Sequence, residues 1–127
     1  AMTPFGEKVR ELRKQKGRLL KKMAMDLGVS SAYLSALEHG YRGCPGTGFL
    51  QQICGYFNLI WDEVEEIKQL AQLSRPRVIV DTSGLSPQAT ELANVLAETI
   101  RELDVETLQW IISEIRGRQA PLKGPTH

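Results

Sequence analysis

Apolar residues recur every three or four positions through the first seventy residues, a spacing typical of amphipathic α-helices. Gly17, Gly28 and Gly40 separate the apolar runs, because glycine tolerates the positive φ that ends a helix. The glycine-rich stretch 41–48 predicts a loop, and Asn58 makes a further break. The pattern predicts five short helices: residues 3–16, Leu20 to Gly28, a third capped by Ser30 and ending near Gly40, a fourth marked by Leu50 to Phe57, and a fifth marked by Trp61 to Leu70.

The pattern changes after residue 73. β-branched residues between Pro76 and Gly84 predict a short strand at Val78, Ile79 and Val80. Ser86 and Pro87 make a favourable helix start, and Asp104 can cap one more helix. The apolar stripes of these two helices predict a hairpin; they consist of Leu92, Leu96, Ile100 and Leu103, then Leu108, Ile111, Ile112 and Ile115. We therefore expect a helical domain over 2–73, a linker over 74–86, a hairpin over 87–117 and a flexible tail over 118–127.

Charge is distributed unevenly along the chain. The net charge of the whole chain is only +1, yet residues 1–50 contain nine Lys or Arg and four acidic residues, a net charge of +5. The remainder has a net charge of −4. A basic front half is typical of a protein that presents one face to a polyanion.

Several classes of protein are disfavoured by composition. No apolar run approaches the roughly 18 residues of a membrane span, and no secretory signal begins the chain, so we expect a cytoplasmic protein without membrane contact. The two cysteines, Cys44 and Cys54, are too few for a disulfide framework, and Cys54 lies on an apolar stripe that predicts a core position. His39 with Cys44 lacks further ligands for a metal, and we expect no cofactor.

Ala24, Gly28 and Leu34 have the spacing of a helix-turn-helix. Two helices that meet steeply over a short turn need a small residue where they approach, a glycine in the turn and an apolar anchor on the second helix. The surrounding runs FGEKVRELRKQKG (5–17) and LGVSSAYLSALEHG (27–40) resemble the XRE (Cro/cI-type) helix-turn-helix family, over about residues 4–72. The fold class that the resemblance implies is all-α, with a lambda-repressor-like five-helix DNA-binding domain before the strand and hairpin.

The resemblance also implies which residues face double-stranded DNA. The third helix would enter the major groove, with its start facing base edges or flanking phosphates. These positions are Ser30, Ser31, Ala32, Tyr33, Ser35 and Ala36. Just beyond the helix, Arg42 is the strongest candidate for a backbone contact, followed by His39 and Tyr41.

The second helix departs from the family pattern at its start. Leu19 and Leu20 occupy places where the family has a serine cap and a polar phosphate contact, and a lost cap costs roughly 1 kcal/mol. Arg18, Lys21 and Lys22 can compensate by attracting phosphate, although cations at a helix start oppose the helix dipole. We therefore include these three cations among the DNA-binding candidates.

The C-terminal hairpin is the candidate dimer interface. A strand at Val78–Val80 has no partner within the chain, so two copies related by a two-fold axis could pair their strands and bury their hairpins. The interface would consist of Val78, Ile79, Val80, Leu92, Leu96, Ile100, Leu108, Ile111, Ile112 and Ile115. The alternative is a monomer in which the stripes fold back onto the N-terminal domain.

Two functions compete at this stage. The first is a sequence-specific transcriptional regulator, a repressor that occupies promoter DNA as a homodimer. The second is an antitoxin or similar module that sequesters a protein partner through the hairpin. An enzyme is disfavoured, because the chain lacks a phosphate-binding loop and any nucleophile–base pair with a supporting motif.

Overall fold

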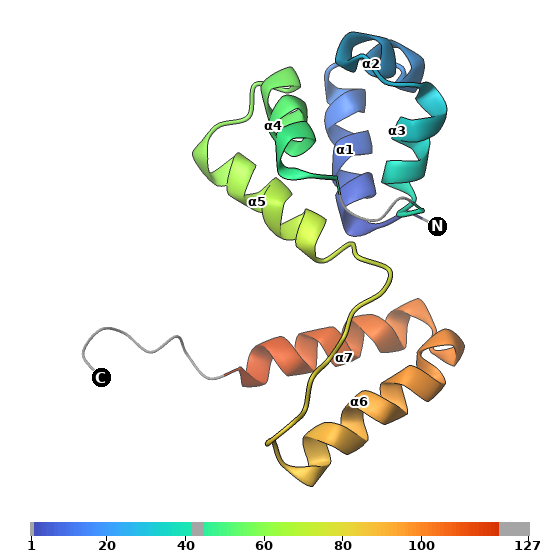
Figure 1. Ribbon diagram of the computed structural model, residues 1–127, viewed down its shortest axis with the longest axis vertical. Helices are drawn as coiled ribbons and strands as arrows, with labels where there is room; N and C mark the ends of the chain where they lie inside the picture. Colours follow the sequence, from blue (N-terminus) through green and yellow to red (C-terminus); the bar gives the residue numbers. More distant parts are fainter. Residues whose placement is uncertain (1, 42–44, 120–127) are drawn as a thin grey trace, which may run out of the picture. The chain divides into compact units, whose positions relative to one another are not determined.

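A computed structural model describes residues 2–41 and 45–119, which contain seven α-helices, one 3-10 helix and no β-strand (Figure 1). The chain divides into two compact units, residues 1–78 and 79–127. None of the described helices is long and apolar enough to cross a membrane.

The N-terminal unit contains the five predicted helices. They are α1 (Pro4–Gln15), α2 (Leu20–Leu27), α3 (Ser31–Glu38), α4 (Thr47–Tyr56) and α5 (Trp61–Gln72). Helix α4 begins earlier than its apolar residues indicated, with Gly46 as its N-cap, so part of the expected loop is helical. The breaks are confirmed, because Gly17, Gly28 and Gly40 have φ angles of +71°, +73° and +79°.

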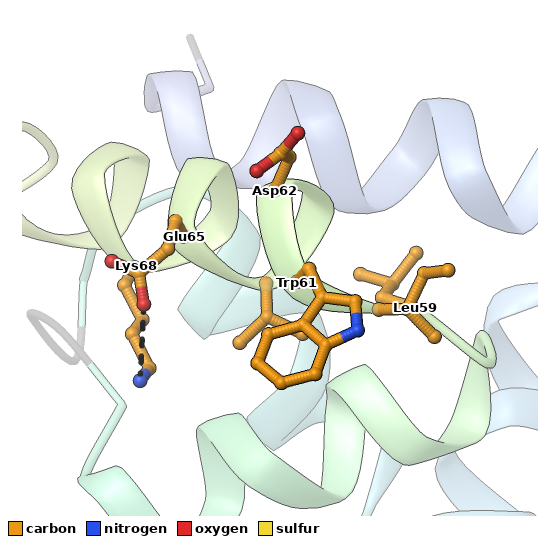
Figure 2. Close-up of a pocket in the computed structure, with 7 residues that line it drawn as sticks. Leu59, Trp61, Asp62, Glu65 and Lys68 are labelled. Atoms are coloured by element: carbon orange, nitrogen blue, oxygen red, sulfur yellow. Dashed lines mark ion pairs between the residues drawn. The ribbon is translucent and has the colours of Figure 1, made fainter.

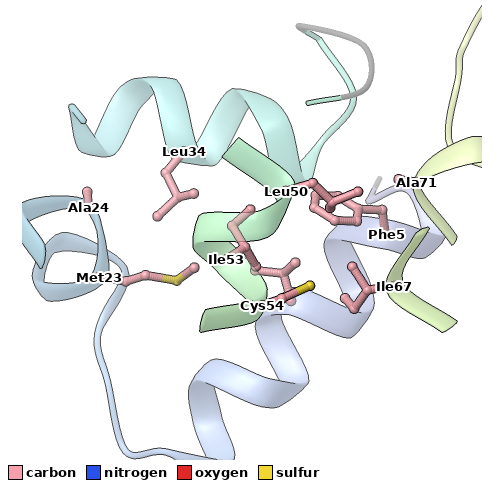
Figure 3. Packing of buried hydrophobic residues seen from close by; sticks show 10 residues of the cluster. Phe5, Met23, Ala24, Leu34, Leu50, Ile53, Cys54, Ile67 and Ala71 are labelled. Atoms are coloured by element: carbon pink, nitrogen blue, oxygen red, sulfur yellow. The ribbon is translucent and has the colours of Figure 1, made fainter. Parts of the chain in front are cut away.

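The core of this unit lies between the helices (Figure 3). Phe5, Met23, Leu34, Ile53 and Ile67 come one from each helix and are at most 2% exposed. Burial of each such side chain contributes about 1.5–3 kcal/mol. Cys54 belongs to the same cluster, which confirms its predicted core position, and burial raises the pKa of its thiol. Each helix therefore provides an anchor to one shared core.

The start of α1 is held by contacts from distant segments. The Thr3 side chain accepts a hydrogen bond from the Gly6 N–H at 3.0 Å and donates one to the Glu38 carbonyl at 3.2 Å. The buried Ser74 hydroxyl accepts a hydrogen bond from the Phe5 N–H at 2.8 Å, which ties the residues after α5 to α1. A Cβ at Gly6 would lie 1.8 Å from the Glu38 carbonyl oxygen, so the close approach of α1 to the end of α3 requires glycine.

The C-terminal unit contains α6 (Pro87–Thr99), a 3-10 helix (Ile100–Glu102) and α7 (Val105–Arg118). Ser86 and Asp104 accept hydrogen bonds from the N–H groups of Ala89 and Thr107, as expected of N-caps. No residue of these three helices is buried. Within its own unit, the hairpin leaves large apolar side chains exposed.

The predicted strand at Val78–Val80 is wrong. These residues have no strand partner within the described part of the chain, and their side chains are 67%, 97% and 66% exposed. β-branched composition favours extended backbone, but a strand needs a neighbour for its N–H and C=O groups.

Candidate nucleic-acid interface

The helix-turn-helix is formed by α2, Gly28 and α3. Ala24 is 2% exposed where the helices approach, Gly28 takes the left-handed conformation after α2, and Leu34 anchors α3 in the core at 1% exposure. All three positions therefore have the environments that their spacing predicted.

The start of α3 combines exposed and half-buried candidates. Ser31 and Ala32 are exposed, while Ser30 uses its hydroxyl to accept a hydrogen bond from the Tyr33 N–H at 3.0 Å. The Tyr33 ring packs edge-on against Phe49 of α4, with centroids 5.9 Å apart. Ser30, Ser31 and Ala32 are all exposed, and of the three only Ser30 uses its side chain as the helix cap.

The other α3 candidates lie closer to the protein. Ser35 and Ala36 are half-buried. The Ser35 carbonyl is 2.9 Å from Nδ1 of His39, whose ring stacks on exposed Tyr41 with centroids 5.7 Å apart. Arg42 lies outside the described residues, as does Cys44. His39 and Tyr41 therefore form one aromatic surface directly after α3.

The start of α2 is basic and lacks a side-chain cap, as the sequence predicted. Leu19 occupies the N-cap position at 77% exposure and makes no capping hydrogen bond, while Leu20 is half-buried. Arg18, Lys21 and Lys22 are exposed. Their positive charge is not matched by any acid in the first turn of α2.

Two of these cations, Lys22 and Arg18, belong to a network with Asp26 and Tyr56 that sequence reasoning missed. Lys22 forms an ion pair with Asp26 at 3.0 Å, and Asp26 accepts a hydrogen bond from the Tyr56 hydroxyl at 2.8 Å. Lys16 lies 5.4 Å from the Tyr56 ring centroid, within cation–π range. The contacts with Lys22 and Tyr56 hold the pKa of Asp26 below its usual value. Only the i,i+4 spacing of Lys22 and Asp26 could have indicated this network.

A buried ion pair supports α3 from the opposite end. Glu38 closes the helix and pairs with Arg13 of α1 at 3.4 Å, with side chains 3% and 12% exposed. Burial raises the pKa of Glu38 despite the nearby Arg13 guanidinium. Arg13 Nε has no hydrogen-bond partner among the described groups. The pair fixes the end of α3 to α1. In the sequence, the one indication of this pair is that the charged Glu38 directly follows the apolar Leu37.

Comparison with known proteins decides the family. A family model described as a helix-turn-helix domain matches residues 6–73. The chain belongs to the XRE-type helix-turn-helix family.

Two curated relatives of this helix-turn-helix chain come from Bacillus subtilis (strain 168). It is 30% identical over 63 residues to the uncharacterized HTH-type transcriptional regulator RghRB, covering 50% of this chain and 45% of that protein. It is 29% identical over 90 residues to the HTH-type transcriptional regulator SinR, covering 65% of this chain and 81% of that protein. The chain thus matches about half the length of the first relative. No solved structure matches it significantly.

The candidate dimer residues of the hairpin form two groups that differ in exposure. Leu96, Leu108 and Ile111 are half-buried within the unit. Leu92, Ile100, Ile112 and Ile115 are between 42% and 51% exposed. Val78, Ile79 and Val80 are also exposed.

Proposed function

We propose that the chain is a DNA-binding transcriptional regulator that represses by occupying promoter DNA as a homodimer. The observation that carries the proposal is the exposed start of α3 beside the basic start of α2. Ser31 and Ala32 are open to solvent in the helix-turn-helix position that enters the major groove. The names of both relatives describe transcriptional regulators, which favours this function over sequestration of a partner protein.

The proposed interface separates positioning from sequence recognition. Lys21 and Arg18 bind DNA phosphates, a contact that is strong but independent of sequence. The Ser31 hydroxyl can donate to or accept from a base edge, and the Ala32 methyl can contact a thymine methyl. These are modest discriminators, so one domain alone has limited specificity.

A dimer would correct this limitation. Two linked domains read two half-sites, and the second binding event becomes intramolecular. The hairpin supports the dimer because its helices have no buried residue but expose Leu92, Ile100, Ile112 and Ile115. A two-fold interface through these side chains would remove them from water without requiring a strand.

Fluorescence anisotropy tests the proposal directly. The full chain is titrated against labelled DNA from upstream of its own gene, with scrambled DNA of equal length as the control. We expect tight binding to the native fragment that survives an excess of scrambled competitor and weakens steeply with salt. Equal affinity for both DNAs, or no binding by folded protein, would refute sequence-specific regulation.

A further inference from the structure

The start of α5 exposes two adjacent large apolar side chains. Ile60 is 65% and Trp61 is 85% exposed, and the Trp61 indole extends away from the α5 ribbon (Figure 2). Half-buried Leu59 and Val64 lie beside them and help to line a groove of about 480 Å³. We call the groove with Ile60, Trp61, Asp62, Glu65 and Lys68 the Trp61 surface.

Neither residue is explained by the stability of the helix. Ile60 stands at the N-cap, where it has no oxygen to accept the free N–H groups of the first turn. Trp61 has a φ of +37°, in the left-handed region that bulky residues rarely adopt. Positions that break local rules without a gain in burial are candidates for function.

The Trp61 surface has a small negative charge. The charged residues that line it are Asp62, Glu65 and Lys68, a net charge of −1, and helix α5 as a whole has a net charge of −3. Glu65 pairs with Lys68 at 3.7 Å, whereas Asp62 has no ion-pair partner among the described residues. An exposed indole next to carboxylates matches a cation on an aliphatic chain, because the indole face and the carboxylates both attract positive charge.

Charge also disfavours the other occupants. The described part of the hairpin unit, residues 79–119, has seven acidic and three basic residues, a net charge of −4, which has the same sign as the charge of α5 and disfavours the hairpin as the occupant. DNA is excluded for the same reason. Helix α5 packs against α1 and α4, whereas the DNA-binding candidates lie on and around α2 and α3, so the two surfaces are separate (Figure 1).

We propose that the Trp61 surface binds a basic segment of a partner protein. The segment places a Lys or Arg against the Trp61 indole, Asp62 and Glu65, and an aliphatic side chain in the groove beside Val64. Exposed tryptophans are frequent energetic anchors of protein interfaces. This function lies beyond DNA binding, and it leaves the α2–α3 surface free for DNA.

The test uses the full chain with Trp110→Phe, which leaves Trp61 as the single tryptophan. The probe is a blocked peptide of three Leu-Arg-Arg-Leu repeats, and the control peptide has Glu in place of Arg. We expect the basic peptide to shift Trp61 emission to shorter wavelength with saturation, and the acidic peptide to cause no shift. A missing shift, or an equal shift with both peptides, would overturn the proposal.

Charge reversal localises the binding. The double substitution Asp62→Lys and Glu65→Lys should lower the affinity for the basic peptide at least about tenfold. The matched pair Glu91→Lys and Glu98→Lys makes the same change in net charge on α6 and should leave the affinity within about twofold. An equal loss of peptide affinity in both double variants would mean that the peptide is attracted by the overall charge, and it would overturn the proposal. Circular dichroism checks that both variants are folded.

Two further measurements separate the remaining outcomes. Acrylamide should quench Trp61 freely in the full chain with Trp110→Phe. Protection of Trp61 would mean that this chain or a second copy already covers the surface, which contradicts the proposal. The double variant on α5 should bind the upstream DNA with the same affinity as the double variant on α6. DNA affinity is thus measured independently, so failure of the Trp61 surface and failure of DNA binding are distinguishable.

Discussion

At the scale of single residues, Arg13 and Glu38 decide how firmly α3 is held. Removing one member of a buried ion pair leaves the other charge uncompensated, a loss of about 3 kcal/mol or more. We therefore expect Arg13→Met to lower the free energy of unfolding by about 3 kcal/mol at pH 7, measured by urea denaturation. Lys14→Met, at an exposed neighbouring position, is the control and should change stability little.

The loss should depend on pH with a defined sign. Glu38 has a folded pKa above its ordinary value of 4.5, so its contribution to stability is fully present below 4.5 and is lost as pH rises through the folded pKa. Without Arg13 the folded pKa rises further. The penalty of Arg13→Met should therefore shrink at pH 4. A penalty that is constant from pH 4 to pH 7 would contradict this account.

Sequence alone predicts residues whose role is set by local spacing. Ala24, Gly28 and Leu34 behave as expected because the turn itself determines what they contact. Arg13, Glu38 and Ser74 were missed because their partners are 25 to 69 residues away in the chain. A charged residue next to an apolar stripe usually lies on the solvated face of its helix. The Arg13–Glu38 pair is buried only because α1 packs against α3.

At the scale of helices, the crossing of α1 and α3 depends on Gly6. Glycine inside a helix usually costs stability, and replacement by alanine usually restores about 0.5–1 kcal/mol. At Gly6 the new Cβ would overlap the Glu38 carbonyl oxygen, so we expect Gly6→Ala to destabilise by about 1–3 kcal/mol.

Gly55 provides the matched control for this prediction. It lies in α4, and a Cβ there would meet no atom within 4 Å. Gly55→Ala should therefore stabilise the protein, or at worst leave it unchanged, in the same denaturant titration. Equal effects of the two substitutions would show that the α1–α3 approach is looser than the structure describes.

Periodicity and capping residues predicted most helix boundaries, whereas β-branched composition wrongly predicted a strand. Ser30, Ser86 and Asp104 cap the helices that their positions predicted, since a cap needs only the next three residues. Val78–Val80 required a partner strand that the described chain lacks. A strand is a property of two segments, so a local pattern cannot establish it.

At the scale of the whole molecule, the hairpin is the part that cannot bury its own apolar surface. The homodimer proposal predicts a light-scattering mass twice the 14.2 kDa of one chain at micromolar concentration. Ile112→Lys with Ile115→Lys should yield monomers and weaken binding to the upstream DNA at least about tenfold. Gln109→Lys, exposed on the same helix, is the control and should stay dimeric. A monomeric wild-type chain would refute the dimer.

DNA binding by the α2–α3 surface should show in how the affinity of a Lys21 variant depends on salt. Each phosphate contact contributes about 0.9 to the slope of log affinity against log salt concentration. We expect Lys21→Ala to reduce the magnitude of this slope on the upstream fragment by about that amount. Lys68→Ala on α5, away from this surface, should leave it unchanged. An unchanged slope for Lys21→Ala, or an equal reduction for Lys68→Ala, would contradict DNA binding by the α2–α3 surface.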